Sequence, residues 1–303
     1  MSGATMVLPD IDVASKPPNI HARVAPRVLS GATALAAAIV VGAGIYVVIS
    51  SGTVHWAVIG QYVFAPEMLH GVFTTIWLTF VSLAGAIVIG TLLAAMRIST
   101  NVVFRGVATA YIWFFRGTPL LVQLVFWFNF GLFLPRLGLF GWSVATNTVI
   151  TSTTAALLGL VLNVSAFMCE VIRGGLLSVD KGQTEAALSL GMMPNAALMR
   201  IVLPQSIRII VPAAGNLAID LLKATSLVYV IGTREILGTV ESISAQNFYV
   251  IELLMVASIW YLALVSVASF AQSRLERWLN RSTAVAKAVK RKDTFNPDTS
   301  VVL

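Results

Sequence analysis

The sequence is poor in the residue types that build covalent or metal-linked frameworks. It contains one cysteine, Cys169, so no intramolecular disulfide can form. Its three histidines, His21, His55 and His70, lack the spacing of metal ligands, which disfavours a metalloenzyme. Charge is also scarce, because 11% of the residues are charged and 57% are hydrophobic, whereas a soluble chain has about 25% and about 45–50%. This balance indicates a membrane protein.

Six apolar runs are long enough to cross a bilayer, since a helix needs about 20 residues to span about 30 Å of hydrocarbon. The first is too long, and begins too late, for a cleaved signal peptide, so we expect it to be retained. We therefore predict an all-α, multi-pass membrane protein with six transmembrane helices. The predicted spans are residues 28–49, 71–96, 118–135, 149–169, 209–231 and 253–272.

The basic residues predict the orientation of these helices. If the N-terminus is cytoplasmic, seventeen of the twenty Lys and Arg residues fall in inner segments, with Arg116 among them. Arg136 and Arg234 are then outside, and Lys223 lies within a span. The positive-inside rule thus places both termini in the cytoplasm. The net charge of +7 is spread over short loops and a tail, which argues against nucleic acid as a partner and allows at most contact with anionic lipid headgroups.

The two ends of the chain differ from the spans in composition. Residues 1–27, which contain four prolines, are predicted to be a mobile cytoplasmic leader, and residues 276–303 a basic cytoplasmic tail.

Small and hydroxylated residues recur at helical spacing along the second span. Such a stripe lets helices approach closely in lipid, so we interpret it as a packing face, with the lining of a permeation path as the alternative. Its members are Thr75, Thr79, Ser82, Gly85, Gly90 and Ala94.

A cytoplasmic loop of about 40 residues between the fourth and fifth spans has the pattern of two short helices. Asp180 or Thr184 could cap the first helix, and Gly191 fits the left-handed position that ends it. Pro194 suits the first turn of a second helix, which is expected to stop near Pro204.

The first of these helices carries small and apolar side chains that need a cover, namely Ala186, Ala187, Leu190 and, just beyond it, Met193. A groove on a partner subunit is one cover. The lipid interface and the protein's own helix ends are the other two, and the pattern does not decide among them.

A motif runs through this loop, and its spacing is EAA, three residues, G, nine residues, I, one residue, LP. Its residues are Glu185, Ala186, Ala187, Gly191, Ile201, Leu203 and Pro204. The motif resembles the EAA loop of permease subunits in bacterial ABC importers, which docks on the ATP-binding subunit. Four further segments resemble the polar amino acid branch of that family, whose members import histidine, glutamine, arginine and opines. They are YIWFFRGTPLLVQL (111–124), CEVIRGGLLSV (169–179), LPQSIRIIVPAAGN (203–216) and LLKATSLVYVIG (221–232).

The resemblance implies a five-helix permease core over residues 70–275, with the EAA loop at about 180–205 and the helix at 28–49 as an addition. It implies a bacterial inner membrane location and a non-enzymatic role. The expected partners are two copies of an ATP-binding subunit, a second permease subunit, identical or similar, and an extracytoplasmic amino-acid-binding protein. ATP and Mg would bind the partner, since the chain has no GxxxxGK[ST] loop to hold phosphates.

Within the EAA loop, Glu185 could anchor the partner by a charge-assisted hydrogen bond, or it could be an ordinary acidic residue favoured by the helix dipole. Two departures from the family put the substrate in doubt. Ala224 stands where relatives commonly have an acidic residue, and Phe167 where they have tyrosine.

Polar residues inside the spans are candidates for a solute path, because buried charge is costly in lipid unless it faces a cavity or a partner. Asp220 and Lys223 could touch solute, or they could pair with each other and hold the hydroxyls that follow. The amides could instead bond across helices, and Glu170 is expected to pair with Arg173. The candidates for the path are Gln123, Asn129, Asn163, Phe167, Asp220, Lys223, Thr225 and Ser226.

Other classes of protein fit the sequence less well. A secondary transporter or channel driven by an ion gradient, with no ATPase partner, is the main alternative, and the EAA spacing argues against it. An intramembrane enzyme lacks a motif, and a scaffold that only recruits a partner is a third alternative.

Overall fold

The computed structural model describes residues 27–50, 52–139 and 142–293. The predicted leader, up to residue 26, and the end of the predicted tail therefore lie outside the described residues. The chain divides into two units, residues 1–55 and 56–303. In the first unit the predicted N-terminal span is a helix, α1 (Arg27–Ser50), with an apolar stretch over Thr33–Gly44. Whether α1 crosses the membrane stays a prediction.

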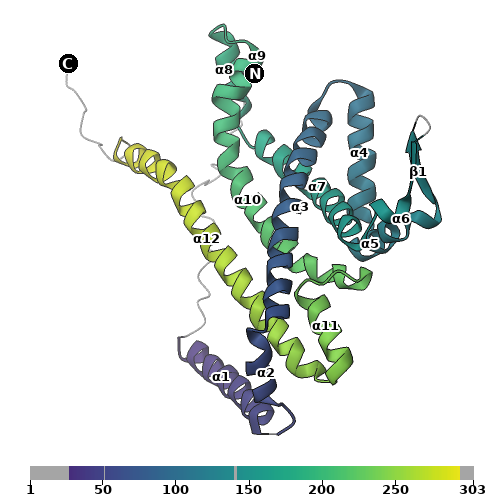
Figure 1. The fold of residues 1–303 in the computed structure, drawn as a ribbon. Helices are drawn as coiled ribbons and strands as arrows, with labels where there is room; N and C mark the ends of the chain where they lie inside the picture. The colour runs from purple at the N-terminus through teal and green to yellow at the C-terminus, as the bar shows by residue number, and fades with distance from the viewer. Residues whose placement is uncertain (1–26, 51, 140–141, 294–303) are drawn as a thin grey trace, which may run out of the picture. The chain divides into compact units, whose positions relative to one another are not determined.

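The second unit is organised around two long helices, α3 (Pro66–Ile98) and α7 (Ser152–Leu177), which match the second and fourth predicted spans. They pack on each other more extensively than any other pair (Figure 1). The small-residue stripe of α3 forms this and neighbouring contacts, which confirms its interpretation as a packing face. A Cβ on Gly90 would lie 2.8 Å from Met168 Cβ, so only glycine allows this approach. The buried members of the stripe are Thr75, Thr79, Ser82, Gly90 and Ala94.

The third predicted span, residues 118–135, is wrong as a straight helix. The chain instead forms α4 (Val102–Gly117) and α5 (Leu120–Phe128), which meet at an angle of 100° and count as one bent span at most. Pro119 explains the break, because it pushes Thr118 out of the helical region, to φ −109° and ψ 140°. Arg116 consequently lies at the end of a helix within the bent span and not in an inner loop as predicted. The remaining inner Lys and Arg residues still greatly outnumber the outer ones, so the predicted orientation does not change.

After α5 the chain makes a 3-10 turn (Phe130–Leu132) and an antiparallel hairpin of β1 (Arg136–Leu139) and β2 (Trp142–Ala145), in which Arg136 pairs with Ala145. A single-turn helix, α6 (Thr146–Val149), then leads into α7. The prediction of an all-α chain misses this hairpin, although the protein is otherwise helical.

The EAA loop folds as α8 (Lys181–Ser189) and α9 (Pro194–Ala197), and the chain continues through a π-helix (Leu198–Val202) into α10 (Leu203–Ala224). Pro204 therefore does not stop the helix, contrary to the prediction. A proline lacks the N–H that an α-turn needs, and here the turn before it is wider, with Leu203 N–H bonded to Leu198 O.

The fifth predicted span corresponds to α10, which runs unbroken through Pro212 and ends in a 3-10 helix (Thr225–Ile231). Irregular backbone thus occurs at both ends of the span and not at its middle, where Pro212, Gly215 and Asn216 suggest it.

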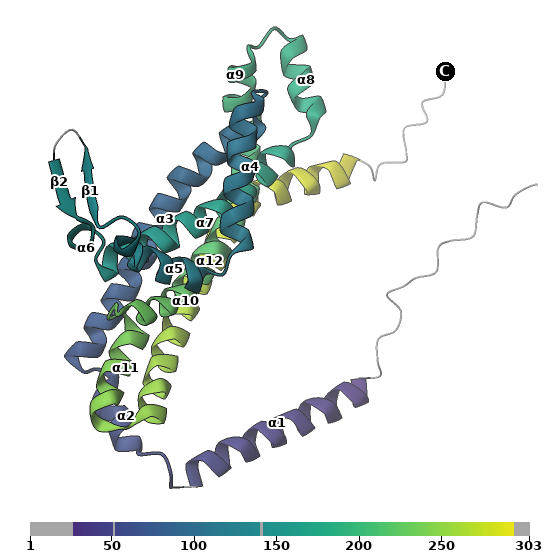
Figure 2. The same cartoon turned by 90° about the vertical axis from the view of Figure 1, so that its right-hand side faces the viewer.

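Three more helices complete the described part of the unit: α2 (Trp56–Val63), α11 (Ile236–Asn247) and α12 (Val250–Asp293). The sixth predicted span, residues 253–272, lies within the apolar stretch Val250–Leu279 of α12. In Figures 1 and 2, α8 and α9 lie at one end of this unit, and α2 and α11 lie at the other. An apolar core between these ends joins α3, α5, α7, α10 and the 3-10 helix. Within the described residues four helices, or five with the bent pair, are long and apolar enough to cross a membrane.

Candidate functional site

The EAA loop projects as a hairpin of two short helices from one end of the unit. Asp180 caps α8, since its Oδ1 accepts a hydrogen bond of 2.6 Å from Gly182 N–H. Gly191 has φ +82°, the left-handed conformation predicted for it. The N–H of Met192 closes the helix end by bonding to Ala187 O at 3.1 Å. The local signals in the sequence therefore locate this hairpin correctly.

The two faces of the hairpin differ in exposure. Ala187 is 2% exposed, so it is buried within the chain and is not part of a free surface. Leu190 and Met193 are 86% and 77% exposed, which is unusual for apolar side chains and marks a surface that a partner could cover. Ala186 is also exposed. Of the three covers considered for these residues, the protein's own helix ends therefore account for Ala187 alone.

Glu185 lies on the exposed side of α8, near the base of the hairpin. It lines a small pocket of about 300 Å³ together with Leu176, Leu177, Lys181 and others. It forms no ion pair with any described residue. A carboxylate in this position can accept a hydrogen bond from a cationic group on another protein.

A second arrangement forms at the break between α4 and α5. The carbonyl of Phe115 has no N–H to bond at Pro119, and two buried side-chain amides bond it instead. Gln123 Nε2 donates to it at 3.1 Å and Asn163 Nδ2 at 2.9 Å. Asn163 Nδ2 also lies 3.3 Å from Gln123 Oε1. Both amides therefore bond between chain segments, which is the alternative to solute contact considered for them.

Arg116 lies at the same break, and its guanidinium carbon is 5.1 Å from the centre of the Phe167 ring on α7. Arg116 is exposed and Phe167 is partly buried. The sequence did not indicate Arg116 as a candidate for the solute path, because a basic side chain near the start of an apolar run is typical of a loop. The signal that could have found it is Pro119, which predicts that a helix ends just before it.

The end of α10 carries the third group of candidates. Lys223 Nζ and Asp220 Oδ1 are 2.8 Å apart, and their side chains are 55% and 68% exposed. Thr225 and Ser226 donate to the carbonyls of Leu222 and Lys223, at 2.7 and 2.8 Å. The predicted pair thus exists, while the two hydroxyls bond the backbone.

The remaining candidates take local partners. Asn129 ends α5 and bonds Val125 O at 2.8 Å. Glu170 pairs with Arg173 at 2.7 Å, as predicted. The structure therefore does not bring all the candidates for a path into one cluster.

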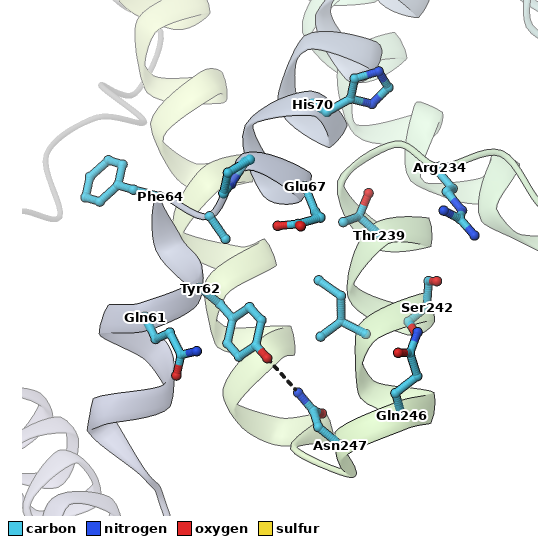
Figure 3. A pocket seen from close by; sticks show the side chains of 13 residues that line it. Gln61, Tyr62, Phe64, Glu67, His70, Arg234, Thr239, Ser242, Gln246 and Asn247 are labelled. Carbon is cyan, nitrogen blue, oxygen red and sulfur yellow. Dashed lines mark hydrogen bonds between the residues drawn. The ribbon is translucent and has the colours of Figure 1, made fainter.

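A large pocket lies at the end of the unit opposite the EAA loop, between α2, α3 and α11 (Figure 3). Its volume is about 1080 Å³, and its walls carry Glu67, His70 and Arg234, none of which is ion-paired among the described residues. Asn247 Nδ2 donates to Tyr62 Oη at 3.3 Å and so links two walls of the pocket. Such a pocket can receive a polar or charged group.

One buried carboxylate, Glu235, is next in sequence to Arg234 of the pocket wall. Glu235 is 0% exposed, caps α11 by accepting from Gly238 N–H at 2.8 Å, and accepts from Tyr261 Oη at 2.5 Å. Thr75 on α3 is 3.4 Å away. Burial raises the pKa of Glu235 above its usual range, although these hydrogen bonds oppose the shift. The residue joins three helices and was not a candidate from the sequence.

Within the part of the chain that the structure describes, no group of three His, Cys, Asp or Glu side chains could hold a metal ion.

Comparison with known proteins relates these features to one family. Residues 86–284 match the family described as the binding-protein-dependent transport system inner membrane component. The chain is 37% identical over 230 residues to the arginine transport system permease protein of Corynebacterium glutamicum, which covers 75% of this chain and 73% of that protein. It is 34% identical over 213 residues to the glutamine transport system permease protein of Escherichia coli K12, and the match covers 70% of this chain and 92% of that protein. It is 36% identical over 219 residues to the nopaline transport system permease protein of Agrobacterium fabrum, and the match covers 71% of this chain and 88% of that protein.

Two solved structures share the fold. A crystal structure of an amino acid ABC transporter with histidines matches with a TM-score of 0.66 and 32% identity, over 74% of this chain and 99% of that one. An inward-facing methionine ABC transporter matches with a TM-score of 0.57 and 21% identity, over 71% and 96%, and supports the fold alone. With the matched region covering most of the helical unit, the chain belongs to the family of inner-membrane permease components of binding-protein-dependent ABC transporters, in the branch that transports polar amino acids.

Proposed function

We propose that this chain is the membrane-spanning permease subunit of an ATP-driven importer of a polar amino acid, coupled to its ATP-binding subunit through the EAA loop. The observation that carries the proposal is the exposed hairpin of α8 and α9. Two large apolar side chains, Leu190 and Met193, stand free at its tip, and the seven motif residues have the family spacing. An apolar tip on a short helical hairpin fits a groove on another protein.

In this proposal the loop acts as a mechanical joint. ATP and Mg bind the partner, which is present in two copies. When the two ATP-binding subunits close on each other, they move the hairpins. Each hairpin then moves the span that follows it. The direct continuation of α9 through the π-helix into α10 supports this, because a rigid connection transmits displacement. Glu185 would hold the hairpin to the partner by a charge-assisted hydrogen bond.

The face of α10 that carries Asp220 and Lys223 supports a path shared with a second permease subunit, identical or similar. Both side chains are more than half exposed in a single chain, and ionised groups in a span do not face lipid. A water-filled path or another protein must therefore cover them. The orientation predicted from the basic residues places both termini and the EAA loop in the cytoplasm. The pocket in Figure 3, at the opposite end of the unit, then faces the outer side, from which a binding protein delivers solute.

The test of coupling is Glu185→Lys and Gly191→Pro, each co-expressed with the ATP-binding subunit and reconstituted with the binding protein. We expect both variants to insert into the membrane but to lose subunit assembly, or to hydrolyse ATP without uptake. Gln183→Lys is the control for Glu185→Lys, since it places the same lysine side chain at an exposed site on the same helix outside the motif.

Normal uptake by both motif variants would refute the coupling role. Uptake by the purified chain alone, driven by an ion gradient, would instead favour the alternative of a secondary transporter or channel.

A further inference from the structure

We propose that Arg116 binds the carboxylate of the transported amino acid inside the membrane. The inference rests on the proposed function, and it begins with the depth of the residue. Asn101 caps α4, accepting from Val103 N–H at 2.9 Å. With the predicted orientation, the short connection between α3 and α4, flanked by Arg97 and Arg105, lies at the cytoplasmic surface of the membrane. Arg116 is fourteen residues beyond Val102, which corresponds to about 21 Å of helix. It therefore lies well within the ~30 Å hydrocarbon layer.

The side of the helix on which Arg116 lies follows from its spacing. Ile112, four residues earlier, is buried against the core, so Arg116 belongs to the edge of the packed face and not to the middle of the lipid-facing one. The lipid-facing side carries Val103 and Trp113, which are 68% and 76% exposed. Contact with the Phe167 ring agrees with this placement, since Phe167 is on the neighbouring helix.

The charge of Arg116 lacks a counter-ion within the described chain. Two carboxylates in the spans already have basic partners, Glu170 with Arg173 at 2.7 Å and Asp220 with Lys223 at 2.8 Å. No described carboxylate is within ion-pair distance of Arg116. A single cation–π contact is weaker than the cost of an isolated guanidinium in hydrocarbon, so a partner from outside the chain is required.

The break fixes the backbone on both sides of Arg116. Gln123 and Asn163 bond the carbonyl of Phe115, the residue directly before it. Gln123 Nε2 also donates to Thr118 Oγ1 at 2.7 Å, on the other side. The guanidinium itself lies over the Phe167 ring. In this position it can present its planar fork to a carboxylate for two parallel hydrogen bonds. Arginine, glutamine and nopaline, which the relatives' names specify, all contain a carboxylate beside the amino nitrogen.

The experiment uses the permease with its ATP-binding subunit and binding protein in proteoliposomes, and [14C]arginine and [14C]glutamine as probes. For whichever probe the native protein transports, we expect Arg116→Gln to lower uptake at least tenfold at subsaturating concentration, and Arg116→Lys to restore part of it. Basal ATP hydrolysis should stay within twofold. Arg105→Gln, an exposed arginine near the other end of α4, is the control and should leave uptake unchanged.

A second measurement does not depend on transport by the variant. In a Cys169→Ala background, the Arg116→Cys variant should react with a membrane-impermeant thiosulfonate. In the native protein, arginine, but not argininamide, should compete with [14C]arginine for binding; if glutamine is the transported probe, glutamine and its α-amide take their places. Equal competition by the amide, normal uptake by Arg116→Gln, or labelling of the Arg116→Cys variant only by lipid-soluble reagents would overturn the inference; the last outcome would show a lipid or second-subunit environment. If the native protein with its ATPase shows no ATP-dependent uptake of any polar amino acid, the proposed function fails and not only the role of Arg116.

Discussion

Replacing Asn163 by leucine tests whether the break between α4 and α5 depends on the buried amides. Asn163 is 8% exposed and donates to Phe115 O at 2.9 Å and to Gln123 Oε1 at 3.3 Å. Leucine has a similar volume but no donor. Phe115 O would keep its bond from Gln123 Nε2, whereas Gln123 Oε1 would lose the donor that it has among the described residues.

The expected cost follows from that one stranded acceptor. A buried polar group without a partner costs ~1–3 kcal/mol, while an interhelical hydrogen bond in a membrane protein averages ~0.6 kcal/mol. We therefore expect Asn163→Leu to lower the free energy of unfolding by about 1–2 kcal/mol. The assay is reversible unfolding in mixed dodecyl maltoside and SDS micelles, followed by tryptophan fluorescence.

Asn129→Leu is the matched control, because that amide is exposed and bonds only the carbonyl four residues back, at 2.8 Å. It should cost less than about 0.5 kcal/mol. Equal effects of the two substitutions would show that the bridge to Phe115 contributes nothing specific.

Four further results are expected. Gly90→Ala should lower the free energy of unfolding by ~1–3 kcal/mol, because its Cβ would lie 2.8 Å from Met168 Cβ, whereas Gly106→Ala, with open space around it, should be neutral or slightly stabilising in the same titration. The charge-swapped double variant Asp220→Lys with Lys223→Asp keeps an ion pair and should fold and assemble, but lose uptake if the pair contacts solute; retained uptake would assign it a structural role. The raised pKa of Glu235 means that its protonation favours the folded state, so this contribution is full below pH 4.5 and is lost as the pH rises through the raised pKa; the melting temperature should fall over that range, and Glu235→Gln should flatten the dependence. Cysteines placed at positions 136 and 200 in a Cys169→Ala background should react with impermeant reagents on opposite faces of the membrane, and labelling on one side would contradict the predicted orientation.

The sequence predicts the EAA hairpin well because its signals are local. Asp180, Gly191 and Pro194 each act within one turn of the chain, and each takes the expected cap or turn conformation. The packing stripe of α3 is predictable for a similar reason, since small residues at helical spacing permit close contact whatever the neighbour is. The neighbour itself, α7, is not encoded in that pattern.

The bend between α4 and α5 could not be predicted from the apolar pattern. Apolar composition alone gives the length of a run but not its path, so residues 118–135 read as one straight helix. Pro119 decides the path locally, while the amides that stabilise the bend come from residues four and forty-four positions further along the chain. Glu235 was missed because its partners, Thr75 and Tyr261, lie on helices far away in the sequence.

The π-helix between α9 and α10 means that this connection contains one residue more than an α-helix of the same length requires. Deleting one residue from 198–202 would turn the wide turn into an ordinary α-turn and leave the helices on both sides intact. The direction of the hairpin would then change little, because the wide turn already absorbs the extra residue. If the same residues formed ordinary α-turns with none deleted, everything before them would rotate by about 100° around the axis of α10, since each residue of an α-helix advances by that angle. The wide turn thus sets the direction in which Leu190 and Met193 point. A full-length variant whose turn became α-helical would be expected to fold and insert normally while presenting its hairpin to the wrong side.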